Sequence, residues 1–269
     1  MSFLAAVVQL NCTSDAAANL AQADMLIRRA ASYGAKLVAT PENTNYLGPH
    51  AEKVRLAEPI PGPTVDRLAA LASELGIHLL VGSVNERGSD TDRCYNTSVL
   101  LGPSGERLAS YRKIHLFDVD HSADVRFAES DTVIPGDEVV VVGTTLGSIG
   151  LSICYDLRFA ELYRALRDGG AEMIAVPSAF TATTGKAHWE ALIRARAIET
   201  QCYVLAPGQT GHHDDLGLRE SHGNSMIVDP WGQVVARASD GPGLALAEID
   251  PNRVAGVRRG MPIAAHRRL

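Results

Sequence analysis

The decapeptide ICYDLRFAEL, residues 153–162, changes character at its second residue. Residues 151–153 finish an apolar run typical of a buried strand, and residues 157–168 place apolar side chains at helical spacing before a pair of glycines. Cys154 stands between them, with polar side chains directly behind it. A thiol that only fills a core needs no polar neighbours, whereas a thiol that attacks a carbonyl needs a base and a group that holds the oxyanion. The rest of the chain would have to supply both.

Strand-like and helical patterns alternate along the rest of the chain, with hairpins in the middle and at the end. Helices are predicted over 16–33, 64–76, 157–168 and 188–201, and strands or hairpins over 4–10, 36–40, 77–84, 94–113, 138–154, 172–178, 202–208, 224–238 and 243–250. A short helix follows the last strand. This mixture predicts an α/β fold with one or two mixed, largely buried sheets and helices outside. Because no linker of biased composition and no internal repeat interrupts it, we expect a single domain over residues 1–269.

The composition is that of an ordinary globular protein. The 269 residues are 46% hydrophobic and 21% charged, with a formal net charge of −6, which offers no basic surface for nucleic acid or for an anionic membrane. No uninterrupted apolar run reaches the length of a membrane span, and the first residues, MSFLAAVVQL, lack the basic start of a signal peptide. We expect the four cysteines to be free thiols in a reducing compartment, and so a cytoplasmic protein.

Two charged side chains lie at the ends of other apolar runs. Glu42 follows the strand 36–40 in VATPENTNY, and Lys113 ends a hairpin strand in SYRKIHLFDVD. Taken singly, such a Glu is usually a helix cap, such a Lys is usually solvated, and a Cys after LSI is usually core packing. Because ligands gather at the carboxyl ends of strands in α/β folds, the three together predict a site that contains Glu42, Lys113 and Cys154.

These three contexts resemble a known family. PEN around Glu42, YRKIHLFD around Lys113 and ICYDLRF around Cys154 are similar, in this order, to the signatures of the nitrilase superfamily of carbon–nitrogen hydrolases. The resemblance continues through PSAFTATTGKAHWEALIRARAIETQCYV to VDPWG. It implies a four-layer αββα sandwich of two mixed sheets with helices outside, paired into a homodimer, and a reaction without a metal or an organic cofactor.

The resemblance also implies roles for single residues. Cys154 would be the nucleophile, Glu42 the general base and acid, and Lys113 the group that stabilises the oxyanion together with the backbone N–H of Tyr155. A second glutamate of the family matches Glu129 in RFAES, where it orients the lysine and the substrate. A thioester would form and then be hydrolysed. We expect the nearby lysine to favour ionisation of the thiol and the carboxylate.

The residues after the nucleophile indicate the class of substrate. Nitrile-cleaving members carry Cys-Trp-Glu, whereas Cys154 is followed by Tyr and Asp, as in amidases. The segments AHWEALIRARAIETQCYV and GHH resemble deaminated glutathione amidases, which release 2-oxoglutarate and cysteinylglycine. KIHLFDVD and CYDLRFAEL also resemble omega-amidases, which release ammonia from α-ketoglutaramate. The stretch NTNYLGPH, residues 43–50, differs from both and leaves the exact substrate open.

A small amide of this kind brings a carboxylate, which a planar guanidinium matches. Arg158 is therefore predicted to bind substrate, although its helical spacing from Glu161 would also fit a surface ion pair. Tyr155, Thr181 and His188 are predicted to bind substrate as well, because the resemblance implies that the segment around His188 borders the active site. Arg194 and Arg196 are expected in structural ion pairs.

Other interpretations are weaker. GHHDD, residues 211–215, contains metal-ligand types, but adjacent side chains rarely converge on one ion, so a polar loop at the rim of the cleft is predicted instead. GTTLGSIG lacks the spacing of a nucleotide-binding loop. A catalytically silent interaction protein and a thiol-based redox sensor remain alternatives; the intact triad argues against the first, and the lack of a resolving cysteine near Cys154 against the second.

Overall fold

Two six-stranded sheets form the centre of the molecule in this computed structural model, which describes residues 1–90, 92–122, 125–213 and 220–268. The first sheet has the order β16-β1-β2-β3-β4-β5 and the second β15-β14-β11-β10-β9-β8. Strands β1 to β3 are parallel, and so are β9 to β11, while the outer strands pair antiparallel. The strands are β1 Phe3–Gln9, β2 Ala35–Ala39, β3 His78–Arg87, β4 Cys94–Leu101, β5 Arg107–Arg112, β8 Val141–Thr144, β9 Gly147–Leu151, β10 Met173–Ala175, β11 Tyr203–Ala206, β14 Met226–Val228, β15 Val234–Arg237 and β16 Gly243–Ile249.

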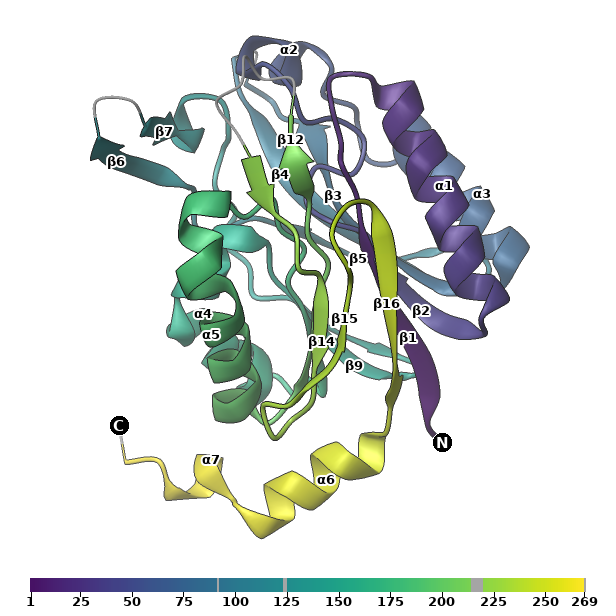
Figure 1. The fold of residues 1–269 in the computed structure, drawn as a ribbon, viewed down its shortest axis with the longest axis vertical. Helices are drawn as coiled ribbons and strands as arrows, with labels where there is room; N and C mark the ends of the chain where they lie inside the picture. Colours follow the sequence, from purple (N-terminus) through teal and green to yellow (C-terminus); the bar gives the residue numbers. More distant parts are fainter. Residues whose placement is uncertain (91, 123–124, 214–219, 269) are drawn as a thin grey trace.

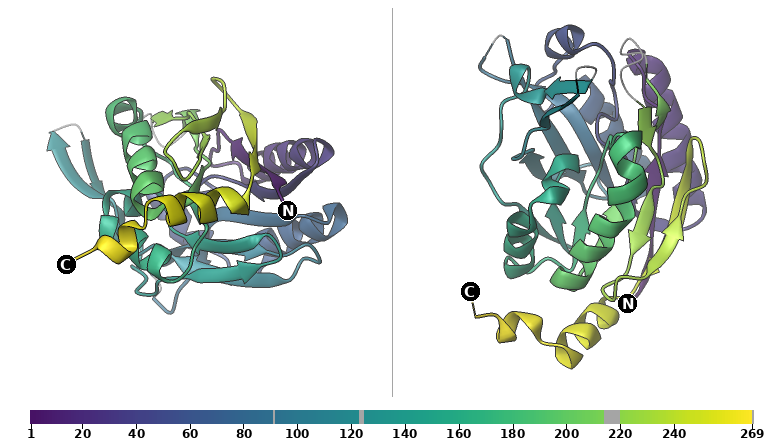
Figure 2. Two further views of the ribbon diagram at one scale, coloured as in Figure 1. Left: turned by 90° about the horizontal axis from the view of Figure 1, so that it is seen from below. Right: turned by 60° about the vertical axis from the view of Figure 1, so that its left-hand side comes forward.

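The helices cover the outer faces of both sheets. Figures 1 and 2 show α1 and α3 outside the first sheet and α4 and α5 outside the second, so that the layers run helix, sheet, sheet, helix. The helices are α1 Ala16–Ser32, α2 His50–Arg55, α3 Pro63–Leu75, α4 Ala160–Asp168, α5 Ala182–Thr200, α6 Pro251–Gly260 and α7 Ile263–His266. The predicted four-layer αββα sandwich is confirmed. Among the described residues, none of the helices is both long enough and apolar enough to cross a membrane.

The continuous apolar runs of the first sheet follow from its position between two cores. Along β1, Ala5 and Val7 point into the core between the sheets, whereas Ala6 and Val8 point into the core under α1 and α3. Strand side chains alternate between faces, so a strand buried on both faces is apolar at nearly every position.

Helix boundaries follow local chemistry. The side chain of Asp15 accepts a hydrogen bond of 3.0 Å from the backbone N–H of Ala18 and so caps α1. Gly76 ends α3 with φ of 61°, a left-handed conformation that glycine adopts without a steric penalty.

Two predicted helices begin elsewhere. The helix predicted at 157–168 starts at Ala160, because residues Cys154–Arg158 form a separate 3-10 turn, η2. The helix predicted at 188–201 starts already at Ala182. Its first turns hold Thr and Gly, which are weak helix formers, but Gly185 lies so close to His222 that a Cβ there would be 2.4 Å from the histidine Cβ. Tertiary packing therefore extends this helix.

Three small elements had no sequence signal that we recognised. They are α2, the hairpin of β6 Asp118–Ser122 with β7 Val125–Ala128, and the hairpin of β12 Thr210–His212 with β13 Glu220–His222. In Figure 1, α2 and the β6–β7 hairpin lie at the same end of the molecule. Residues of α2 and β7 line the pocket described below.

Candidate active site

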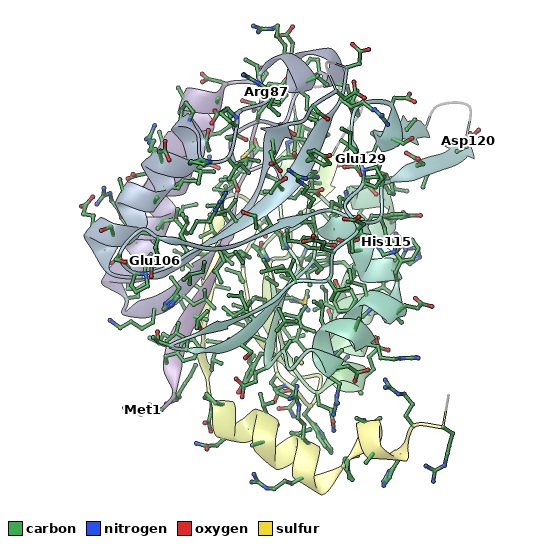
Figure 3. All side chains as sticks on the ribbon, turned by 180° about the vertical axis from the view of Figure 1, so that it is seen from behind. Met1, Arg87, Glu106, His115, Asp120 and Glu129 are labelled. Atoms are coloured by element: carbon green, nitrogen blue, oxygen red, sulfur yellow. The ribbon has the colours of Figure 1, made fainter. Side chains whose placement is uncertain are left out.

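The predicted catalytic side chains meet at one edge of the two sheets. Glu42 follows β2, Lys113 follows β5, and Cys154 follows β9. Glu129 begins η1 Glu129–Asp131, directly after β7. All four line one pocket, together with residues from both halves of the chain. Seen from behind, Glu129 and His115 lie on the right of the view, and Glu106 lies on the left (Figure 3).

Lys113 lies between two carboxylates and is 2% exposed. Its Nζ is 3.0 Å from Oε1 of Glu42 and 2.8 Å from Oε2 of Glu129. Burial by itself lowers the pKa of Lys113, but the two carboxylates outweigh it and hold that pKa well above its usual value. The lysine is therefore an ammonium group, which can hold a developing oxyanion.

The carboxylate of Glu42 is held on both oxygens. Oε1 accepts from Lys113 and, at 2.9 Å, from Nδ2 of Asn96, while Oε2 accepts from the backbone N–H of Ala179 at 2.7 Å. The backbone carbonyl of Glu42 accepts from Nε2 of Gln209 at 2.8 Å. A carboxylate oriented in this way is placed to exchange a proton with a neighbour, as general acid–base catalysis requires.

Glu129 accepts a hydrogen bond of 2.7 Å from the backbone N–H of Phe117, besides its contacts with Lys113. Burial alone would raise the pKa of Glu129, but the ammonium groups of Lys113 and Lys53 lower it to about 2. Glu129 therefore stays ionised and fixes the position of Lys113.

Cys154 has a strained backbone. Its φ is 49°, which a side chain other than glycine rarely adopts, and its N–H donates to the carbonyl of Pro177 at 2.9 Å. Burial first of all, and then the Glu42 carboxylate, raise the pKa of the Cys154 thiol well above its usual value, and Lys113 offsets this only in part. The expectation that the lysine would favour the thiolate is thus corrected: burial and the carboxylate outweigh the lysine, and the resting group is a thiol.

Asp156, two residues after the cysteine, joins the cysteine turn to the lysine segment. It is completely buried and accepts from the Tyr111 hydroxyl at 2.7 Å and from the backbone N–H of Ile153 at 2.9 Å. The backbone N–H of His115 reaches it at 3.0 Å, and Nδ1 of His115 lies 2.7 Å away. This network holds residues 153 and 115 in one arrangement, so Asp156 is a positioning residue for the site.

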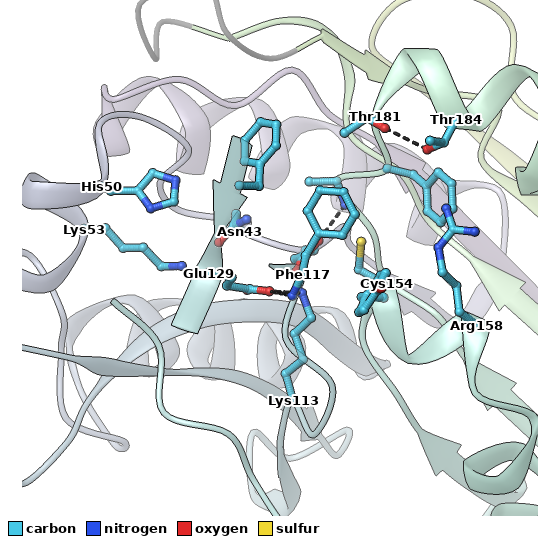
Figure 4. A pocket seen from close by; sticks show the side chains of 15 residues that line it. Asn43, His50, Lys53, Lys113, Phe117, Glu129, Cys154, Arg158, Thr181 and Thr184 are labelled. Atoms are coloured by element: carbon cyan, nitrogen blue, oxygen red, sulfur yellow. Dashed lines mark hydrogen bonds and ion pairs between the residues drawn. The ribbon is translucent and has the colours of Figure 1, made fainter. Parts of the chain in front are cut away.

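The four predicted substrate-binding residues divide into two groups. Tyr155, Arg158 and Thr181 line the pocket. The Arg158 guanidinium lies 5.2 Å from the ring centroid of Phe180, at one side of the pocket in Figure 4, so it faces the pocket and not Glu161. His188 is exposed and lies outside the lining, with its Nδ1 3.3 Å from Nη1 of Arg158. The assignment of His188 to the pocket wall is therefore corrected: it reaches the pocket only through Arg158.

The other arginine prediction agrees with the structure. Nη1 of Arg196 lies 2.6 Å from Glu199, and Nη1 of Arg194 lies 3.9 Å from Glu190. Both arginines are in ion pairs along α5, as expected.

The sequence did not point to about half of the residues that line the pocket. The residues that it did not single out are Asn43, His50, Lys53, Phe117, Phe127, Ala179, Phe180 and Thr184. Asn43 and His50 come from the NTNYLGPH stretch that differs from the family pattern, which was the available signal for them. Phe117 and Phe127 come from the segment after Lys113, where apolar residues also fit simple packing.

A metal site is not found among the described residues, in which no group of three or more metal-ligating side chains is close enough to share an ion. In the GHHDD stretch, His213 is 4% exposed, with Nδ1 2.7 Å from the Cys12 carbonyl and Nε2 2.9 Å from Oγ of Ser221. Residues 214 and 215 lie outside the described residues. The four cysteines are free, as predicted.

Comparison with known proteins assigns the family. The carbon-nitrogen hydrolase family model matches residues 4–259. Human deaminated glutathione amidase is 46% identical over 98% of this chain and 82% of its own length, and human omega-amidase is 39% identical over 99% of this chain and 95% of its own. The crystal structure of Saccharomyces cerevisiae Nit3, described as a member of the nitrilase superfamily, superimposes with a TM-score of 0.88 at 33% identity over 100% of this chain and 97% of that one. With this match to fold and sequence, the chain belongs to the carbon–nitrogen hydrolases of the nitrilase superfamily and is an amidase.

Proposed function

We propose that this protein hydrolyses the amide bond of deaminated glutathione, giving 2-oxoglutarate and cysteinylglycine, through a thioester on Cys154. The observation that carries the proposal is the buried Lys113, 3.0 Å from Glu42 and 2.8 Å from Glu129, in the pocket that also contains Cys154 and Arg158. Amide hydrolysis needs a nucleophile, a proton carrier and an oxyanion donor, and Cys154, Glu42 and Lys113 supply one each.

In the first half-reaction, Glu42 takes the thiol proton while Sγ of Cys154 bonds to the amide carbon and the carbonyl electron pair moves onto oxygen. Lys113 holds this oxyanion. The N–H of Cys154 already donates to Pro177, so the backbone N–H of Tyr155 is the next donor along the turn. Glu42 then gives its proton to the leaving nitrogen, the C–N bond breaks, and a thioester remains.

In the second half-reaction, water attacks the thioester. Glu42 takes a proton from the water, the second oxyanion is held as the first was, and the C–S bond breaks as the sulfur regains a proton. The acid leaves, and the thiol and carboxylate return to their starting states. A resting thiol with a raised pKa suits this scheme, because the proton moves only when the bond to carbon forms.

Deaminated glutathione is favoured as substrate by the relative that carries this name at 46% identity. The omega-amidase reaction on α-ketoglutaramate is the second candidate, favoured by the 39% identical relative. Both substrates present the same 2-oxo acid to Arg158, and they differ in the leaving group, which is cysteinylglycine in one and ammonia in the other.

The test is to incubate the protein with deaminated glutathione, α-ketoglutaramate and a neutral amide, and to measure 2-oxoglutarate, ammonia and free amine. We expect the highest kcat/KM on deaminated glutathione and a mass increase of one acyl group on Cys154 when the reaction is quenched early. Faster turnover of α-ketoglutaramate would assign the protein to the second reaction. No turnover and no acylation would identify a catalytically silent member of the fold.

Three further features complete the proposal. The chain acts as one domain, since both sheets contribute side chains to one pocket. It is cytoplasmic, in keeping with four free cysteines.

It forms a homodimer. The dimer would cover Ile198 and Trp231, whose side chains are large and apolar and which are 47% and 52% exposed. Light scattering coupled to size-exclusion chromatography tests this.

A further inference from the structure

The pocket has positive charge on two opposite sides. In Figure 4, Arg158 lies on one side of Cys154, while His50 and Lys53 lie on the other, beyond the contact between Lys113 and Glu129. Arg158 comes from η2, and His50 and Lys53 come from α2. The two groups of side chains therefore reach the pocket from separate parts of the chain.

Lys53 is not an ordinary solvated lysine. Its side chain turns inward, and the residue is 9% exposed, whereas the side chain of Arg55, two positions further along α2, is 67% exposed and pairs with Glu52. Burying an ammonium group costs free energy unless anions face it. Glu129 is such an anion, because Lys53 is one of the two ammonium groups that lower the pKa of Glu129.

Cations line the pocket on both sides of the reacting cysteine. Lys53, Lys113 and Arg158 line the pocket with two carboxylates, those of Glu42 and Glu129. Both carboxylates contact Lys113 directly. Arg158 and Lys53 thus lie on either side of the reacting cysteine, and this arrangement favours a ligand with an anionic group at each end.

We propose that Lys53, with His50 beside it, forms a second carboxylate-binding subsite that takes the carboxylate of the leaving group, while Arg158 takes that of the acyl group. This inference rests on the proposed function and narrows its substrate class to amides with an anionic group on each side of the bond that breaks. Deaminated glutathione has both carboxylates, and α-ketoglutaramate has only the one on the acyl side.

The orientation of the substrate follows from the different lengths of its two arms, which run from the reacting carbon to the two carboxylates. Arg158 lies on the same turn as Cys154, near the carbon that the thiol attacks, and suits the short arm that joins this carbon to the acyl carboxylate. Lys53 lies beyond Lys113 and Glu129 and suits the longer arm, a dipeptide that ends in a carboxylate (Figure 4).

The experiment compares two substrates that share the acyl group. One is deaminated glutathione, and the other is its glycinamide form, which lacks the carboxylate of the leaving group. We expect the wild-type protein to have a KM about 10- to 100-fold lower for the free acid, the range for a charge-assisted contact. Lys53→Met should raise the KM for deaminated glutathione to the KM for the glycinamide form, and the KM for the glycinamide form should stay at its wild-type value. Lys53→Arg should restore much of the preference.

Arg55→Met is the matched control, because it removes a cation from the same helix on the solvent side and should change neither KM. Equal KM values of the wild-type protein for deaminated glutathione and its glycinamide form would overturn the subsite. A Lys53→Met variant whose kcat falls equally on both substrates would also overturn it, because Lys53 would then act only through Glu129. If the wild-type protein cleaves neither compound but cleaves α-ketoglutaramate, the proposed function itself fails, and the subsite falls with it.

Discussion

At the floor of the pocket, Nζ of Lys113 lies 3.0 Å from Glu42 and 2.8 Å from Glu129, in surroundings that leave it 2% exposed. At the mouth, Arg158 is half-buried, and its polar contact is one of 3.3 Å with the exposed His188. The floor groups are oriented by several hydrogen bonds before a substrate arrives, which is how electrostatic stabilisation of a transition state avoids reorganisation. The mouth is less constrained, so substrate choice can change there while the chemistry below is kept.

Removing the nucleophile is the strongest test of the floor. Cys154→Ala should abolish amide hydrolysis while far-ultraviolet circular dichroism and the thermal midpoint stay close to wild type, because the residue is small and packs at the pocket surface. Iodoacetamide should modify the wild-type protein at this one thiol, since Cys12, Cys94 and Cys202 are buried away from the pocket. Wild-type turnover in Cys154→Ala would contradict the mechanism.

The next largest effects are expected for the lysine and its carboxylate partner. Glu42→Gln and Lys113→Ala should each lower kcat by on the order of 10²-fold or more, because a general base or an oxyanion donor is lost. Lys113→Ala also leaves two buried carboxylates without their cation, so its thermal unfolding has to be measured with its kinetics. Glu42→Gln keeps the shape of the side chain, and near-normal kcat in this folded variant would remove Glu42 from its assigned role.

At the mouth, the expected change is smaller and falls on binding. Arg158→Ala should raise the KM for deaminated glutathione by roughly 10- to 100-fold, the range for a lost charge-assisted hydrogen bond, and should affect a neutral amide much less. Arg164→Ala, an exposed arginine on α4, is the control. Equal losses on charged and neutral amides would mean that Arg158 supports the pocket wall instead of binding a carboxylate.

The smallest effect concerns the pH dependence of stability. The pKa of Glu129 is about 2 in the folded protein, below its ordinary value of 4.5, so between these values the unfolded chain binds more protons than the folded one. The stabilisation by this carboxylate is complete above pH 4.5 and is lost as the pH falls toward 2. Urea unfolding should therefore show a difference between wild type and Glu129→Gln that shrinks over this range. If this difference in the free energy of unfolding stayed constant with pH, Glu129 would not be the carboxylate that titrates over this range.

Local patterns were sufficient to predict most of the fold and to select the three side chains proposed as catalytic. Residues 4–10, apolar at every position except Gln9, indicated a buried strand, and β1 lies between the two cores. Glu42, Lys113 and Cys154 were found because each follows a strand and stands in a motif with polar neighbours. Such signals are local, since strand periodicity and the residues at a strand end can be read within a few positions.

The rest depended on contacts between distant parts of the chain. Asn96 donates to Glu42 across 54 positions, and Asp156 holds Tyr111 across 45. Lys53 reads as one more charged residue of a polar stretch, and only the packing of α2 turns it toward the pocket. The same holds for the early start of α5, where Gly185 packs against His222.

The sequence by itself determined most strands and helices, the family and the three predicted catalytic side chains, because periodicity and motifs are properties of neighbouring residues; the four layers were implied by the resemblance to the family. Only the tertiary structure decided the protonation of Lys113 and Cys154. From the sequence, the lysine near Cys154 favoured a thiolate; in the folded protein, burial and the Glu42 carboxylate raise the pKa of the thiol instead. The sign of such a shift depends on how deeply a group is buried and which charges surround it, and both are set when separate segments fold together.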